Sequence, residues 1–109
     1  MAVGKDFFPK MHPVPGFKLG VSSAGIKKSG KKDLVVMEIT EGSTIGGSFT
    51  KNLFCAAPVE LAKERIYSNK IRYLVTNTGN ANAGTGDIGK QHAESICESI
   101  ANSVSVNKE

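Results

Sequence analysis

Apolar positions change their spacing about halfway along this chain. In the first half they form short runs, and residues 34–39 are almost continuously apolar, which predicts a β-strand covered on both faces. Residues 17–26 predict an earlier strand, and residues 44–50 predict a later one that Gly46 and Gly47 weaken. We therefore expect a meander of antiparallel strands in this half.

The second half opens with helical spacing. Pro58 suits the first turn of a helix, because its missing N–H has no intrahelical partner there. Val59, Ala62 and Ile66 follow at intervals of three and four residues, so we expect them to share the buried face. The charged side chains between them are expected to point outward: Glu60, Lys63 and Glu64.

A further strand, a loop and a long helix complete the pattern. Residues 71–76 predict the strand, and residues 78–86 form a loop with three Gly and two Asn. Asp87 can cap the last helix by accepting hydrogen bonds from its first backbone N–H groups. The buried face of that helix is expected to hold Ala93, Ile96, Cys97, Ile100 and Val104.

Together these elements predict an α/β fold of the α+β kind, with antiparallel strands followed by a helix, a strand and a helix. Residues 1–15 contain three of the four prolines and predict an extended lead-in, and residues 16–109 predict one domain. The 109 residues are 39% hydrophobic and include no Trp, so large side chains for a core are few. We expect an incomplete domain that needs further polypeptide.

Charge and cysteine content narrow the function classes. The net charge of +4 is concentrated in residues 1–33, where seven Lys and two Asp give +5. Lysines on both sides of Ser29 and Gly30 predict a solvated hairpin turn, because the Arg and stacking aromatic side chains typical of nucleic-acid sites are missing there. Neither nucleic acid nor a membrane is an expected partner. Cys55 and Cys97 lie too far apart for a zinc or redox motif, which favours a reduced, cytoplasmic compartment.

One segment matches nucleotide-binding motifs. Gly84 to Gly89 has the form G-x-G-x-x-G, and Gly84 to Lys90 has the form G-x-x-x-x-G-K, both of which bring backbone N–H groups to phosphate. However, Gln91 stands where a phosphate loop has Ser or Thr, and Asp87 adds a repelling charge. A helix-capping turn is the favoured interpretation, and a stand-alone nucleotide-binding or anion-binding module is the alternative.

Other chemistry-bearing residues are isolated. The two histidines, His12 and His92, cannot form a multi-histidine metal site, and His92 is expected to be a packing or surface residue. Cys55 lies between Phe54 and Ala56 and is expected to act as a small buried hydrophobe. From its residues alone, the chain holds no self-sufficient catalytic constellation and predicts no metal.

Three groups of segments nevertheless carry a specific resemblance. Residues 76–86 (Thr-Asn-Thr-Gly-Asn-Ala-Asn-Ala-Gly-Thr-Gly) resemble the signature loop of the glutamate N-acetyltransferase/ornithine acetyltransferase family of arginine biosynthesis. The other segments that resemble the N-terminal part of this family's α chain are 16–17, 24–27, 32–34, 41–44, 49–52 and 54–59.

The resemblance implies an acetyl shuttle. Family members are precursors that cut themselves before a threonine, and this residue then carries acetyl from N-acetylornithine to glutamate. It also implies a larger layered α/β fold of the N-terminal-nucleophile type and a heterotetramer of two α and two β chains. No cofactor is implied, although acetyl-CoA serves some members as a donor substrate.

The family's nucleophilic threonine and its Ser-Thr-Gly oxyanion segment would both follow Glu109. The resemblance therefore transfers no catalytic residue to this chain, which is expected to be an α-chain fragment that is inactive alone. Asn77, Asn80 and Asn82 are the candidate site residues. Their amides either tie down the loop's own backbone, which is the favoured interpretation, or shape the substrate site.

Overall fold

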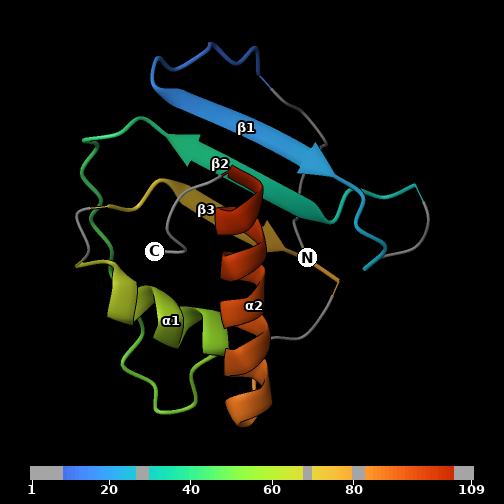
Figure 1. Cartoon of the computed structure of the whole chain (residues 1–109), viewed down its shortest axis with the longest axis vertical. Helices are drawn as coiled ribbons and strands as arrows, with labels where there is room; N and C mark the ends of the chain where they lie inside the picture. Colours follow the sequence, from blue (N-terminus) through green and yellow to red (C-terminus); the bar gives the residue numbers. More distant parts are fainter. Residues whose placement is uncertain (1–8, 27–29, 68–69, 80–82, 105–109) are drawn as a thin grey trace.

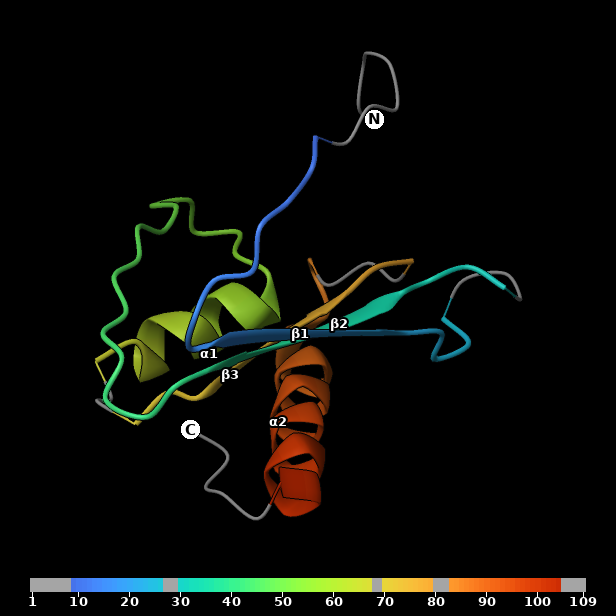
Figure 2. The same ribbon diagram turned by 90° about the horizontal axis from the view of Figure 1, so that it is seen from above.

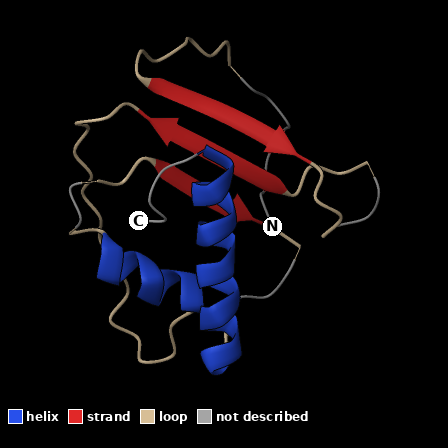
Figure 3. Cartoon of the chain, viewed as in Figure 1, coloured by secondary structure: helices blue, strands red, loops and turns tan. Residues whose placement is uncertain are grey.

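The computed structural model describes residues 9–26, 30–67, 70–79 and 83–104. Two strands, a helix, a third strand and a long helix follow one another along the chain (Figures 1 and 3). Their bounds are β1 Phe17–Ser22, β2 Leu34–Ile39, α1 Ala57–Arg65, β3 Tyr73–Asn77 and α2 Gly86–Val104. The mixed α/β class with antiparallel strands is confirmed.

The three strands form one antiparallel sheet in the order β1-β2-β3. Phe17 pairs with Ile39 at one end of the β1–β2 hairpin, and Leu34 pairs with Asn77 at one end of the β2–β3 pair. The strands predicted near 17–26, 34–39 and 71–76 are therefore present. The third strand, β3, follows α1 in the chain and pairs with β2.

The strand predicted at 44–50 is wrong, because this segment is irregular in the structure. Two successive glycines remove the side chains that would pack a strand on its neighbours. The backbone at Gly47 instead runs against the side chain of Ile66, and a Cβ at Gly47 would overlap Ile66 Cδ1. The segment thus follows the end of α1 in place of pairing with the sheet.

Coverage of the sheet is one-sided. In Figure 2, α2 projects from one side of the sheet only. Burial alternates along β3, with Tyr73, Val75 and Asn77 half-buried and Leu74 and Thr76 exposed. All six positions of β2 are half-buried, so the prediction that this strand is covered on both faces does not hold within the described residues.

The helices pack mainly against each other. In α1 the buried side chains are Ala57 and Leu61, which are 7% and 6% exposed, whereas Ala62 of the predicted face is exposed. Val59 and Ile66 of the predicted face are half-buried, so the prediction fails at Ala62, because the contact with α2 selects the inward side of α1.

The inward face of α2 is also shifted from its prediction. Ala101 is its buried residue, and Ala93, Cys97 and Ile100 are half-buried. Ile96 and Val104, which were expected to be buried, are exposed. Their exposed fractions are 40% and 38%, so neither side chain is enclosed by the described residues.

A buried carboxylate organises the loop after β1. Asp33 is 2% exposed, and its carboxylate oxygens accept hydrogen bonds from the backbone N–H groups of Ala24 (2.6 Å) and Ile26 (2.8 Å). Gly25 lies between these donors at φ +81°, a left-handed conformation that glycine adopts without strain. The backbone of Asp33 also bonds Ser22 and Thr78, so this residue ties the β1–β2 loop to the end of β3.

Candidate functional site

The glycine-rich motif forms the start of α2. The helix begins at Gly86, and the carbonyl of Thr85 accepts a hydrogen bond from Gly89 N at 3.2 Å. This bond places Thr85 at the N-cap, two residues before Asp87, so the predicted cap by Asp87 is wrong. Asp87 lies in the first turn, where its charge still complements the helix dipole.

Packing accounts for Gly84 and Gly89 of the motif, and backbone conformation accounts for Gly86. Gly84 and Gly86 have positive φ values of 69° and 59°, which suit a turn. A Cβ at Gly84 would come within 2.9 Å of the Phe54 ring, and a Cβ at Gly89 would overlap Thr85 Oγ1 and lie 3.6 Å from Ala57 Cβ. Gly89 is therefore the point where α2 accommodates both its cap and α1, and the geometry supports the helix-capping interpretation.

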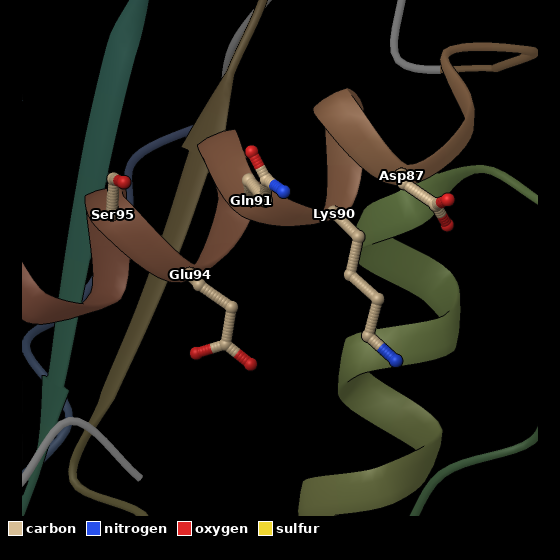
Figure 4. A pocket seen from close by; sticks show the side chains of 5 residues that line it. All are labelled: Asp87, Lys90, Gln91, Glu94 and Ser95. Atoms are coloured by element: carbon tan, nitrogen blue, oxygen red, sulfur yellow. The ribbon is translucent and has the colours of Figure 1, made fainter.

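Lys90 is engaged by carboxylates. Its Nζ lies 2.7 Å from Glu64 Oε1 of α1 (Figure 4 shows the side chain extending toward that helix). The hydrogen bond that Lys90 donates to Glu64 and the negative charge of Glu64, together with the charges of Glu60 and Glu94, raise the pKa of Lys90 above its ordinary value of 10.5. Glu64 is exposed, as the helical spacing predicts, and still reaches Lys90 across the two helices.

A shallow hollow of about 560 Å³ lies beside this residue, lined by Asp87, Lys90, Gln91, Glu94 and Ser95 (Figure 4). It contains two carboxylates and one ammonium group that already has an anionic partner. A phosphate placed here would meet two negative charges and a compensated positive one. The geometry thus disfavours the anion-binding alternative.

A second cross-helix ion pair joins Arg65 and Glu94, whose atoms Nη2 and Oε2 are 2.5 Å apart. With the Lys90–Glu64 pair it connects α1 to α2 at two points. Sequence analysis missed both pairs. The available signal was the complementary charge order of the two helices, with Glu64 before Arg65 on one and Lys90 before Glu94 on the other.

The candidate asparagines lie at the end of β3 or follow it. Asn77 is half-buried and pairs with Leu34 across the sheet. Thr78 N then bonds the Asp33 carbonyl at 3.0 Å, so the chain leaves the sheet beside the loop that Asp33 organises. Asn80 and Asn82 lie outside the described residues. The predicted roles of all three remain predictions.

The cysteine on the α1 side belongs to a loop contact. Cys55 Sγ donates to the Asn52 carbonyl at 2.8 Å, and Lys63 Nζ lies 3.7 Å from the sulfur while donating to the Thr50 carbonyl at 2.8 Å. Lys63 was expected to point outward and instead fastens this loop to α1. His12 and His92 are exposed.

A second hollow, of about 460 Å³, lies at the end of the sheet where the chain enters β1. Arg72 borders it, donating from Nε to the Ile39 carbonyl at 2.8 Å and reaching Glu38 at 3.4 Å. These contacts hold the start of β3 against β2. Within the described residues, no cluster of three metal-binding side chains occurs, and no helix is long and apolar enough to cross a membrane.

Sequence comparison with curated proteins identifies relatives that share one name. The arginine biosynthesis bifunctional protein ArgJ of Pseudomonas syringae is 60% identical over 101 residues, which are 93% of this chain and 25% of the relative. The protein of the same name from Pseudomonas fluorescens is 59% identical over the same shares. The chain thus spans about a quarter of the length of the curated relatives it matches.

Solved structures agree with the sequence matches. An ornithine acetyltransferase of Mycobacterium tuberculosis, solved in complex with ornithine, superposes with a TM-score of 0.76 at 32% identity, over 84% of this chain and 48% of that one. The ArgJ protein of Bacillus halodurans superposes with a TM-score of 0.77 at 25% identity, over 86% and 49%. The sequence profile of the ArgJ family matches residues 18–109. This chain therefore belongs to the ArgJ family.

Proposed function

We propose that the chain is the N-terminal part of an acyltransferase of arginine biosynthesis, which moves acetyl from N-acetylornithine to glutamate. The observation that carries this proposal is the 60% identity to a protein named for arginine biosynthesis, over nearly the whole of this chain. The 32% identical ornithine acetyltransferase, solved with ornithine, supports ornithine as the leaving product.

The proposed reaction has two steps that share an acetyl-threonine intermediate. A threonine hydroxyl attacks the acetyl carbonyl of N-acetylornithine, the C–N bond breaks, and ornithine leaves with the hydroxyl proton on its amine. The α-amine of glutamate then attacks the ester, which returns the threonine hydroxyl and forms N-acetylglutamate. Splitting the transfer in this way replaces one difficult displacement by two easier ones. Acetyl-CoA is a second donor that the same intermediate would accept.

Relative lengths support a cleaved precursor. A match of 101 residues that forms 25% of a curated relative corresponds to a polypeptide of about 400 residues. In the solved ornithine acetyltransferase, 84% of this chain's 109 residues forms 48% of the solved chain, which corresponds to about 190 residues. A solved chain about half as long as the curated relatives is what a self-cleaving precursor with an α and a β chain would leave.

This chain alone is proposed to be inactive. Among the described residues, Cys55 donates to the Asn52 carbonyl and lies 3.7 Å from Lys63 Nζ, and both histidines are exposed. The threonine nucleophile and the oxyanion donors are assigned to polypeptide that would follow Glu109. The proposed assembly is a cytoplasmic heterotetramer of two α and two β chains without a cofactor.

A hybrid enzyme tests the proposal. In the Pseudomonas syringae relative, the matching quarter is replaced by this chain, and the product is expressed in an arginine auxotroph that lacks its own acetyltransferase. We expect growth without arginine and transfer of acetyl from N-acetylornithine to glutamate in the purified hybrid. The 109-residue chain expressed alone should give neither. A folded, soluble hybrid that transfers no acetyl group would refute the assignment.

A further inference from the structure

A cysteine and a lysine meet where the loop before α1 packs on that helix. Cys55 Sγ lies 3.7 Å from Lys63 Nζ, with Cys55 on the loop and Lys63 in the last turn of α1. The cysteine is a free thiol, and both side chains are half-buried, so part of each stays open to solvent. The proposed transfer of acetyl to glutamate assigns no role to either residue.

Hydrogen bonds hold both members of this pair in place. Sγ donates to the Asn52 carbonyl at 2.8 Å, and Nζ donates to the Thr50 carbonyl at 2.8 Å. The loop between them is braced by Asn52, whose N–H donates to Thr50 Oγ1 at 3.2 Å and whose Oδ1 accepts the Phe54 N–H at 3.0 Å. The sulfur and the nitrogen are thus in contact before any reaction, which removes the entropy cost of bringing them together.

A thiol beside an amine is suited to passing an acyl group from sulfur to nitrogen. A thiolate is the stronger nucleophile toward an acyl donor, and the S-acyl product is still reactive enough for an amine to convert it to a stable amide. The carbonyl carbon of an S-acetyl group is one bond from Sγ. Rotation about the Cβ–Sγ bond is therefore the movement needed to bring it within the roughly 3–3.5 Å of Nζ that a near-attack geometry requires.

The surroundings favour Lys63 over another lysine at a helix surface. The loop that carries the sulfur faces solvent, since residues 50–54 are all exposed, so a dissolved donor can approach. Within the described residues, the hydrogen-bond partners of Lys63 Nζ are a neutral carbonyl and the thiol. Lys90 instead donates to the Glu64 carboxylate, and its raised pKa keeps it protonated and unable to attack.

We propose that Cys55 and Lys63 form a self-acetylation site, at which Cys55 takes acetyl from an acyl thioester of the acetyl-CoA class and passes it to Lys63. In the first step the Cys55 thiolate attacks the thioester carbonyl, the bond to the sulfur of coenzyme A breaks, and the leaving thiolate takes up the proton that the Cys55 thiol released. The product of this step is an S-acetyl group on Cys55.

The second step moves the acetyl group to nitrogen. Lys63 loses its ammonium proton to solvent, and the free amine attacks the new thioester. The C–S bond breaks, and the returning Cys55 thiolate takes one amine proton. The products are coenzyme A, Nε-acetyl-Lys63 and the original thiol, so no oxidant or reductant is needed. Each chain is modified once, and the neutral amide no longer gives the Thr50 carbonyl a charged donor.

Incubation of the 109-residue chain with acetyl-CoA tests the site. Cleavage after glutamate places Cys55 in the peptide 42–60 and Lys63 in the peptide 61–64, so mass spectrometry follows the two acetyl groups separately. We expect Lys63 to be acetylated at least about tenfold faster than Lys90, because a held pair reacts at an effective molarity far above that of the dissolved donor.

Three variants separate the steps. Cys55→Ser keeps an O–H donor for the Asn52 carbonyl and should slow acetylation of Lys63 about tenfold or more. Cys97→Ser removes the other free cysteine, which is half-buried on α2, and as the matched control should change the rate less than about twofold. Lys63→Arg keeps a cation for the Thr50 carbonyl but accepts no acetyl group, so a thioester that hydroxylamine removes should accumulate on Cys55.

The same variants supply the results that would overturn the proposal. Acetylation of Lys63 as fast in the Cys55→Ser chain as in the parent would do so, and so would equal rates at Lys63 and Lys90. The absence of a hydroxylamine-sensitive acetyl group from the Lys63→Arg chain would have the same meaning, provided that its far-UV circular dichroism matches that of the parent. The reaction uses neither N-acetylornithine nor glutamate, so its outcome is independent of the proposed function.

Discussion

Replacement of Asp33 tests whether a single carboxylate holds the β1–β2 loop and the end of β3 together. The side chain is 2% exposed, and its two oxygens accept backbone N–H groups from Ala24 and Ile26 at 2.6 and 2.8 Å. Asp33→Ala removes both acceptors and leaves a small void. Asp33→Asn keeps the shape but turns one acceptor into an N–H₂ group that faces a backbone donor.

The magnitude follows from the number and quality of the bonds. A hydrogen bond to a charged acceptor contributes about 1.5–3 kcal/mol, so two give an upper value of about 6 kcal/mol for their joint loss. Ala24 and Ile26 are exposed residues, and water can reach their N–H groups once the loop opens. Burial of the charged carboxylate is unfavourable in the parent chain, and its removal in the variant offsets a further part of the lost hydrogen-bond energy. We therefore expect Asp33→Ala to lower the free energy of unfolding by about 2–4 kcal/mol.

Urea unfolding followed by circular dichroism measures this loss, and hydrogen exchange locates it. The amides of Ala24 and Ile26 should lose their protection in both variants, even where the global change is small. Glu41→Gln is the control, because Glu41 is an exposed acid in the turn after β2, and its neutralisation should change stability by less than about 0.5 kcal/mol. An Asp33→Ala chain as stable as the Glu41→Gln chain, with both amides still protected, would refute the reasoning.

Three further predictions concern α2 and the loop before it. Gly89→Ala forces a Cβ against Thr85 Oγ1 and should lower the free energy of unfolding by about 1–3 kcal/mol in urea titrations; the same change in a Thr85→Ala background should cost less, and equal costs would contradict the clash. Lys90→Met should lower the free energy of unfolding at neutral pH but not above the raised pKa of Lys90. A raised pKa contributes stability that is present below the unfolded value of 10.5 and is lost as the pH rises through the pKa of the folded state. The same variant should leave nucleotide titrations unchanged, because the parent chain is expected to show no saturable binding, and Lys90-dependent binding would revive the anion-site alternative. In the hybrid enzyme, Asn80→Ala and Asn82→Ala should leave acetyl-transfer rates and substrate affinities intact if these amides only tie down their own loop, and a rise in KM without unfolding would assign them to the substrate site.

Local patterns predicted the elements better than the faces that those elements bury. The apolar run at 34–39 is a strand because alternate side chains reach both sides of the sheet, a property of the run itself. The inward side of α1 depends on α2, which follows more than twenty positions later, so Leu61 could not be separated from Ala62 by spacing. The strand expected at 44–50 failed for a related reason, since Ile66 rather than a strand is the neighbour of Gly47.

The glycine-rich motif shows the same limit at the candidate site. Its residue types are those that bring backbone N–H groups to phosphate, and only the structure shows what occupies the space around each glycine. Phe54 fills the space at Gly84, and the Thr85 hydroxyl fills it at Gly89. Gln91 and the acidic Asp87 depart from the phosphate-loop pattern and so favoured a capping turn, and α2 does begin in this motif, at Gly86.

The thin core and the exposed apolar side of the sheet have one physical origin. On that side of the sheet lie the exposed Phe17, Leu19, Val21 and Leu74. A folded domain of this length has a radius of gyration of about 13 Å, whereas this chain has one of 15.3 Å. Its composition is ordinary for a globular protein at 39% hydrophobic, yet the fully buried apolar residues of the described chain are Ala57, Leu61 and Ala101. The apolar side chains are therefore present but face outward. They lie on one side of a sheet whose strands are already paired by hydrogen bonds. An apolar sheet face of this kind is typical of a layer that packs on another layer. The two helices contact each other through the buried Ala57, Leu61 and Ala101, and the pairs Lys90–Glu64 and Arg65–Glu94 add little at the surface. It follows that a polypeptide that covers this side of the sheet should raise the unfolding temperature of the chain, which thermal unfolding followed by circular dichroism measures.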